Sequence, residues 1–246
     1  MTLGEDQDMD ESEQPTILVP VDVSDPSTPS QALVTLVGPL HVVLLGYYQV
    51  PDQSAPEQLR EEYEDEASAN LEGVAESFET EGAEVDAVIV FTRDRQTSID
   101  RIASEYECDA VFVPGTIEQV GRVLVPLRGD PNLERIVMFV GRLIRGSDIE
   151  VTLYHAVTPG EDPTESEFIL RGAADRMSEE SIDRDRITWE QSETESPVSE
   201  IVSLAEEHDV VVIGETEPSL RERILGDVPT RIIDQTGRPV FVIRAL

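Results

Sequence analysis

Residues 17–27 read ILVPVDVSDPS, and residues 123–131 read VLVPLRGDP. Each stretch is an apolar run with a proline at its fourth position, followed by a loop that contains Asp-Pro. Short apolar runs bounded by turn residues are typical of buried strands. The same series of predicted elements follows each stretch, so the chain reads as one α/β unit written twice.

The first copy alternates between strand and helix patterns. Its clearest helix has apolar residues at spacings of three and four, namely Leu59, Tyr63, Ala67, Leu71, Val74 and Phe78. Four strands are predicted around the helices, at residues 17–21, 42–45, 85–91 and 110–113. Strands that alternate with helices predict a parallel, doubly wound sheet.

The second copy repeats this order and then extends it. Its strands are predicted at residues 123–127, 151–157, 187–189 and 210–213. A further helix with Leu220, Ile224, Ile232 and Ile233 leads to a fifth strand, Pro239–Ile243, which the first copy lacks. We therefore predict two tandem domains, residues 15–119 and 120–246, the first without the last helix and strand. Residues 1–14 carry a run of acidic side chains and are expected to be a disordered tail.

The charge balance limits the classes of partner. Among the 246 residues, 52 are Asp or Glu and 18 are Lys or Arg, which gives a net charge of −34, and every one of these cations is arginine. Such a surface repels itself unless salt screens it, which indicates a protein adapted to a high-salt interior. A GC-rich genome is the alternative explanation for the missing lysine, but it does not account for the excess of acid. Neither nucleic acid nor an anionic membrane is expected as a partner, because no basic stripe is present.

The remaining composition favours a cytoplasmic protein without metal. The single cysteine, Cys108, excludes an internal disulfide and a cysteine-built metal site. No signal peptide precedes the first strand, and no apolar run approaches the roughly 20 residues that span a bilayer. The three histidines are far apart in sequence, and we expect His155 to lie in the core and His41 and His208 to lie at strand boundaries.

Three segments resemble the universal stress protein family: the two opening stretches and the closing segment VVVIGETEPSLRERILGDVPTRIIDQTGRPVFVIR, residues 210–244. The resemblance implies a fold like that of the adenine-nucleotide α-hydrolases. It also implies an ATP site in the crevice at the carboxyl ends of the first and fourth strands, where ligands bind in doubly wound sheets. In the family, the loop after the fourth strand has the pattern Gly, two residues, Gly, nine residues, Gly, then Ser or Thr.

The chain matches that pattern only in part. The candidate nucleotide-binding residues are Pro20, Val21, Asp22, Pro126, Leu127, Gly214, Gly226, Asp227 and Thr230. Glu217 replaces the second glycine, and Asp227 replaces the Ser or Thr. Asp22 matches the family's acidic residue but belongs to the copy without a phosphate loop, whereas the second copy has Arg128 at that position. Neither copy therefore holds a whole site, and we expect either no cofactor or weak binding of ATP or AMP.

The predicted function is a non-catalytic stress-response or regulatory protein with a degenerate nucleotide crevice. Because only the second copy has a fifth strand, Pro239–Ile243 is expected to offer a free edge for a homodimer. The alternative is a ligand-free interaction module that binds a protein partner, for example a membrane transporter that it regulates. A third interpretation, an enzyme of a related adenine-nucleotide α/β group, lacks a recognisable nucleophile or base motif.

Overall fold

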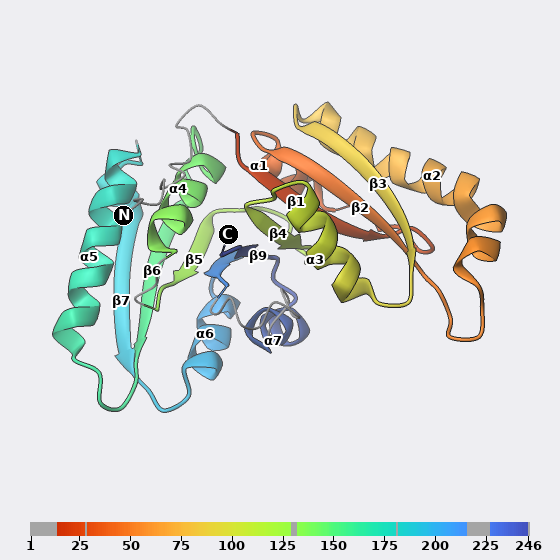
Figure 1. Cartoon of the computed structure of the whole chain (residues 1–246). Helices are drawn as coiled ribbons and strands as arrows, with labels where there is room; N and C mark the ends of the chain where they lie inside the picture. The colour runs from red at the N-terminus through yellow and green to blue at the C-terminus, as the bar shows by residue number, and fades with distance from the viewer. Residues whose placement is uncertain (1–13, 28, 129–131, 181, 216–226, 246) are drawn as a thin grey trace, which may run out of the picture.

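The computed structural model describes residues 14–27, 29–128, 132–180, 182–215 and 227–245 (Figure 1). Helices and strands alternate along the chain, which confirms the predicted α/β class. The strands are β1 (Thr16–Asp22), β2 (His41–Gln49), β3 (Glu84–Thr92), β4 (Ala110–Val113), β5 (Arg122–Pro126), β6 (Glu150–Val157), β7 (Ile187–Glu193), β8 (Val210–Gly214) and β9 (Val240–Ile243). The helices are α1 (Gln31–Val37), α2 (Pro56–Thr80), α3 (Arg95–Glu105), α4 (Leu133–Leu143), α5 (Pro163–Glu179), the 3-10 helix η1 (Arg184–Arg186), α6 (Pro197–Glu206) and α7 (Asp227–Thr236).

All nine strands of the described residues form one sheet in the order β3-β2-β1-β4-β9-β8-β5-β6-β7. From either outer edge inward, the four strands of each half follow the same order, third, second, first and fourth. All neighbouring strands run parallel except β4 and β9, which are antiparallel. This single reversal means that the strands of the two halves point in opposite directions.

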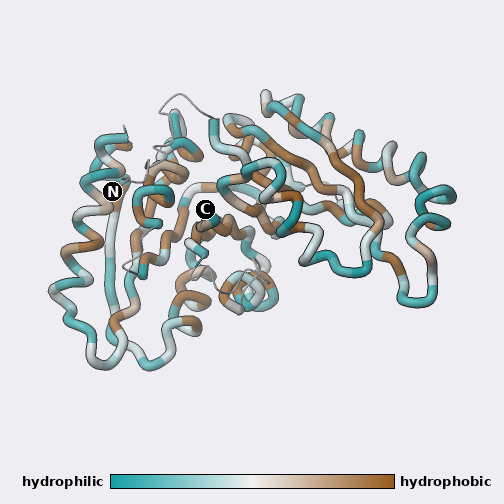
Figure 2. The backbone as a smooth tube through the Cα atoms, viewed as in Figure 1, coloured by the Kyte–Doolittle hydropathy of each residue, from teal (hydrophilic) through white to brown (hydrophobic). Residues whose placement is uncertain are grey.

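Both faces of the sheet are covered by helices, as parallel sheets require. One buried cluster joins the sheet to α1, α2, α4 and α5, and a second cluster joins the other face to α3, α6 and α7. Hydrophobic residues accordingly concentrate along the strands, and the helices are hydrophilic on their outer sides (Figure 2). The strands of the sequence pattern are found, but β2 and β7 extend beyond it, because their polar ends pair with neighbouring strands.

The predicted free edge at Pro239–Ile243, and with it a dimer through that strand, is wrong. One edge of β9 pairs with β8, and the other pairs with β4, where Phe112 lies opposite Phe241. The first half has no fifth strand of its own, so β4 would otherwise leave its backbone groups without partners. Pairing β4 with β9 satisfies both edges within one chain.

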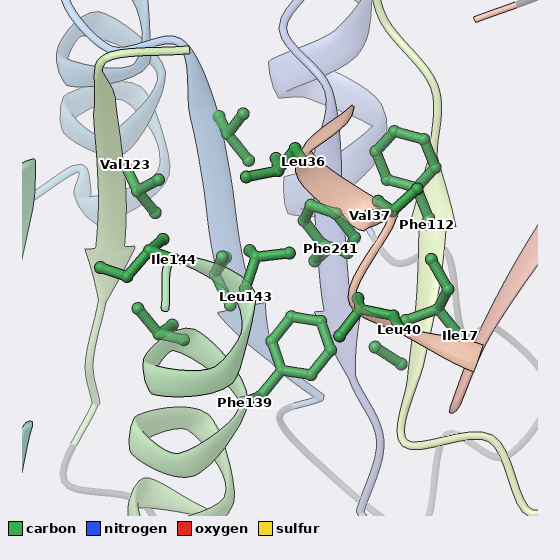
Figure 3. Close-up of a cluster of buried hydrophobic side chains, with 14 of the residues drawn as sticks. Ile17, Leu36, Val37, Leu40, Phe112, Val123, Phe139, Leu143, Ile144 and Phe241 are labelled. Carbon is green, nitrogen blue, oxygen red and sulfur yellow. The ribbon is translucent and has the colours of Figure 1, made fainter. Parts of the chain in front are cut away.

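An aromatic cluster fills the joint between the two halves. The ring of Phe241 on β9 stacks on Phe112 of β4, with centroids 4.6 Å apart, and contacts Phe139 of α4 at 5.4 Å. Figure 3 shows these rings beside Leu40 and Leu143, which come from opposite halves. The buried core is therefore continuous across the joint rather than divided into two separate cores.

Candidate functional site

The predicted nucleotide-binding residues lie at two opposite edges of the sheet. These two edges are formed by the ends of the strands and are not the outer strands β3 and β7. Pro20, Val21 and Asp22 lie at the carboxyl end of β1. Because β4 and β9 are antiparallel, the carboxyl ends of β5 and β8 point the other way. Pro126, Leu127 and Gly214 therefore lie at the opposite edge.

The edge that carries Asp22 has an aromatic ring and a cation close by. Asp22 lies opposite Tyr47 in the strand register, and its Oδ1 accepts hydrogen bonds from the backbone N–H and the hydroxyl of Ser24, at 3.0 and 2.6 Å. The guanidinium of Arg95, at the start of α3, lies 4.8 Å from the centre of the Tyr47 ring. Burial raises the pKa of the Tyr47 hydroxyl, Arg95 opposes this rise, and Asp22 adds to it.

The loop after β4 in the first half packs against the segment that precedes β9. Thr116 donates its backbone N–H to the carbonyl oxygen of Gly237 at 2.9 Å. At Gly115 a Cβ atom would lie 2.3 Å from that same oxygen and 2.5 Å from the nitrogen of Pro239. The glycine is therefore needed for close approach of two backbones, in the position where the family resemblance implies a phosphate loop.

At the opposite edge, polar groups of the second half bind one another. The Nδ1 atom of His155 lies 2.8 Å from the carbonyl oxygen of Leu127, and the residue is 5% exposed, which confirms the expected core position. Asn132, directly before α4, donates from its side chain to the carbonyl oxygen of Glu215 at 3.3 Å. The Glu215 carboxylate in turn accepts the backbone N–H of Ala245 at 3.0 Å.

A second carboxylate, that of Glu161, also lies near this edge. Its Oε2 accepts the backbone N–H of Thr158 at 2.6 Å and lies 3.9 Å from Nε2 of His155. The hydrogen bonds from Thr158 hold the pKa of Glu161 below its usual range, and the charges of His155 and Arg128 lower it further. The side chain is therefore ionised at neutral pH, and the edge carries negative charge at Glu161.

Part of the predicted phosphate loop lies outside the described residues. Gly226 and Glu217 belong to that part of the loop. Residues 1–13 of the predicted tail also lie outside the described residues. Asp227 is the first residue of α7, and Thr230 is an exposed residue of the same helix. Sequence reasoning did not identify Arg95, Asn132 or Glu161. In the sequence, Asn132 follows an Asp-Pro pair and Glu161 follows Gly160, so residues that favour turns were the available signal.

The described residues hold few other groups suited to chemistry. No group of three or more His, Cys, Asp or Glu side chains among them is arranged to hold a metal ion. Cys108 is fully buried, and burial raises the pKa of its thiol to about 12. The Nδ1 atom of His208 lies 2.7 Å from the carbonyl oxygen of Leu204, in the last turn of α6.

The sequence profile of the Universal stress protein family matches residues 119–244. This segment contains β5 to β9, and with them the carboxyl ends of β5 and β8, where Gly214 lies. The chain belongs to the universal stress protein family. Among proteins of curated function, a sequence search finds no match. Within the described residues, no helix has both the length and the apolar character needed to cross a membrane.

Solved universal stress proteins share the fold. One from Archaeoglobus fulgidus aligns over 93% of this chain and 96% of its own, with 15% sequence identity and a TM-score of 0.66. A putative universal stress protein from Pseudomonas aeruginosa aligns over 95% of this chain and 94% of its own, with 14% identity and a TM-score of 0.57. A further Archaeoglobus fulgidus protein, solved in complex with dAMP, aligns with 52% of this chain and 99% of its own, at 22% identity and a TM-score of 0.38.

Proposed function

We propose that this universal stress protein is a non-catalytic regulatory protein of a salt-rich cytoplasm, with two incomplete nucleotide crevices. In this proposal, residues 15–119 and 120–246 are two copies of one unit. Asp109 and Asp209 support the duplication, because each precedes the fourth strand of its half and binds the backbone at the start of the first strand. The two units within one chain then take the place of a dimer of separate chains.

The observation that carries this proposal is the separation of Asp22 from Gly214. An acidic group for the nucleoside and a glycine loop for the phosphates must face one crevice to bind one nucleotide. Here the antiparallel pairing of β4 with β9 directs the two residues to opposite edges. Each crevice therefore keeps one part of the site and lacks the other.

The second-half edge adds an electrostatic penalty. Glu215 directly follows Gly214, so a triphosphate bound at the loop after β8 would lie close to this carboxylate, and the ionised Glu161 adds negative charge at the same edge. Each such repulsion costs on the order of 1 kcal/mol at the dielectric of a protein surface, which corresponds to several-fold in affinity. Arg128, in the segment after β5, opposes this repulsion only in part, since its charge already acts on Glu161. Weak binding of ATP or AMP is the result that we expect.

Equilibrium dialysis with labelled ATP and Mg²⁺ in molar KCl tests this function. The intact chain should bind with a Kd of about 1 mM or weaker. If the weak site is in the second half, Gly226→Val should weaken binding and Asp22→Asn should leave it unchanged; the reverse pattern would place the site in the first half. Asp175→Asn, an exposed change on α5, controls for the loss of one charge.

Two outcomes would contradict the proposal. A saturable site of micromolar affinity would show that one crevice is complete. Turnover of ATP above a buffer blank would show that the chain is an enzyme. A complete absence of binding at millimolar ligand would instead favour the ligand-free interaction module.

A further inference from the structure

The two outer edges of the sheet, β3 and β7, differ in chemistry (Figure 1). On β3, the four residues from Val88 to Phe91 are all apolar and half-buried. On β7, the matching stretch from Glu190 to Glu193 is polar and includes two carboxylates. Charged residues on an edge strand prevent pairing with other chains, so β7 is protected and the second half of β3 is not.

Val88 and Glu190 occupy equivalent positions in the two halves. Pro20 pairs with Leu45, and Leu45 pairs with Val88. In the second half, Pro126 pairs with Tyr154, and Tyr154 pairs with Glu190. The pairing register thus puts an apolar residue on one edge at the place where the other edge carries an acid.

The backbone of β3 has hydrogen-bonding groups directed toward the free edge. The N–H of Val50, which follows β2, donates to the carbonyl oxygen of Thr92 at 2.8 Å, so Thr92 directs its backbone groups toward β2. These groups alternate along a strand in the side to which they point. Those of Val85, Ala87, Ile89 and Phe91 therefore point away from β2, and β2 is the single strand that pairs with β3 in the described sheet.

We propose that the β3 edge (Glu84–Thr92) binds the β3 edge of a second copy of this chain, antiparallel and with Val88 on the twofold axis. In this register all nine strand residues are paired. Val85 lies opposite Phe91, and Ala87 lies opposite Ile89, so the residues whose backbone groups face outward form the hydrogen-bonded pairs.

The extent of the pairing selects this register over its neighbours, and the charges of β3 permit it. In an antiparallel pair, two residues directly opposite each other have their side chains on the same face of the sheet. With a twofold axis normal to the sheet, this is possible only if one residue meets its own copy at the axis. The alternative registers therefore place Ala87, Ile89 or another neighbour of Val88 on the axis. With Val88 on the axis, Glu84 faces Thr92 and Asp86 faces Val90. With Ala87 or Ile89 on the axis, seven of the nine strand residues would be paired. In the Val88 register no two carboxylates of β3 are directly opposite each other. Like charges directly opposite each other destabilise a strand pair.

The pairing also continues the packing of one face of the sheet. Val85, Ile89 and Phe91 already pack against the cluster that includes α2. In the dimer, these side chains would meet the same row of the partner, and the apolar layer under the two α2 helices would become continuous. The net charge of −34 on each chain opposes association, so the dimer should be stronger at high salt.

A cysteine cross-link tests the axis directly. The one native cysteine is buried and has a thiol pKa of about 12, so it does not compete in the intact chain. In Val88→Cys, two thiols would meet across a non-hydrogen-bonded pair, whose Cα atoms are about 4.5 Å apart and within disulfide range. Mild oxidation in molar KCl should give a covalent dimer in at least about tenfold higher yield than for the matched control Glu190→Cys.

A charge variant tests the same axis without chemistry. Val88→Glu places two carboxylates opposite each other and should weaken dimerisation about tenfold or more, whereas Val88→Thr should keep the dimer. Light scattering after size exclusion measures the mass, and circular dichroism shows that both variants are folded. Equal cross-linking of Val88→Cys and Glu190→Cys would overturn the proposal. So would a monomeric intact chain in molar KCl at concentrations up to about 100 μM.

Discussion

The Nη1 atom of Arg244, directly after β9, lies 2.6 Å from the carbonyl oxygen of Ala103 in the last turn of α3. The same nitrogen reaches the carbonyl oxygen of Cys108 at 3.3 Å, and Nη2 donates to the Ser104 hydroxyl at 2.9 Å. A cation that binds the last carbonyls of a helix also interacts favourably with the helix dipole. The second half therefore caps a helix of the first, across the joint that β4 and β9 form.

Replacing Arg244 should destabilise the whole chain. Arg244 is 8% exposed, and Arg244→Met keeps much of its packing but removes the Nη1 hydrogen bonds to the carbonyl oxygens of Ala103 and Cys108, of which the Ala103 oxygen keeps the backbone N–H of Cys108. Hydrogen bonds to charged groups contribute more than neutral ones, so we expect a loss of about 2–4 kcal/mol in the free energy of unfolding. Denaturant unfolding in molar KCl measures it.

The control for the Arg244 variant is a change on α3, the helix that Arg244 caps. Arg101→Ala breaks an exposed ion pair with Glu105, and we expect a change of about 0.5 kcal/mol or less. A similar small effect for Arg244→Met would show that the cap does not hold the two halves together.

The close approach at Gly115 gives a second prediction. Gly115→Ala puts a Cβ atom 2.3 Å from the carbonyl oxygen of Gly237, which is backbone and cannot rotate away. The loop must shift, and we expect a loss of about 1–3 kcal/mol in the free energy of unfolding. At Gly73, in α2, a Cβ would have nothing within 4 Å, so Gly73→Ala should instead stabilise the helix by about 0.5–1 kcal/mol. Thermal unfolding should therefore show a lower melting temperature for Gly115→Ala and a higher one for Gly73→Ala than for the native chain. Changes of the same sign in both variants would contradict this account of the joint.

The sequence predicted each half of the fold but not how the halves join. The alternation of strands and helices predicts parallel pairing within a half, and β1 to β4 and β5 to β8 pair in this way. The direction in which β9 meets β4 is not encoded in the same way, because AVFV and VFVI are apolar at every position and can pair in either sense. Strand direction decides which edge carries each loop. Asp22 and Gly214 were therefore correctly placed at strand ends, but their separation needed the structure.

Cys108 provides a reporter of unfolding. Burial raises the pKa of its thiol to about 12, so the folded chain holds the unreactive protonated form at pH 8. A thiol reagent should therefore modify the folded chain at a negligible rate and the denatured chain completely. Fast labelling of the folded chain in molar KCl would show that the site opens locally.

The same shift predicts a dependence of stability on alkaline pH. The pKa of Cys108 is higher in the folded chain than in the unfolded chain, so the folded state binds this proton more tightly. Its contribution is fully present below the unfolded value, near pH 9, and is lost as the pH rises toward about 12. Denaturant midpoints should fall over this range more steeply for the native chain than for Cys108→Ala. Equal slopes would show that other groups account for the loss.

Salt should stabilise the folded chain, because the excess acidic side chains are held close together only in the folded state. The 52 acidic and 18 basic side chains lie closer together in the folded state than in the unfolded ensemble, so repulsion among them favours unfolding. Raising the ionic strength from about 0.1 M to 1 M shortens the Debye length from about 10 Å to about 3 Å, which removes most of the repulsion between exposed groups. The urea midpoint should rise steadily over this range of KCl.

A bulk effect of the salt on apolar burial would also raise the urea midpoint. The test therefore compares the native chain with a variant in which three exposed acids of α2, Glu61, Glu62 and Glu72, are changed to Gln. The variant should be more stable than the native chain in low salt and should gain less from KCl; equal salt dependence would show that charge repulsion is not the cause.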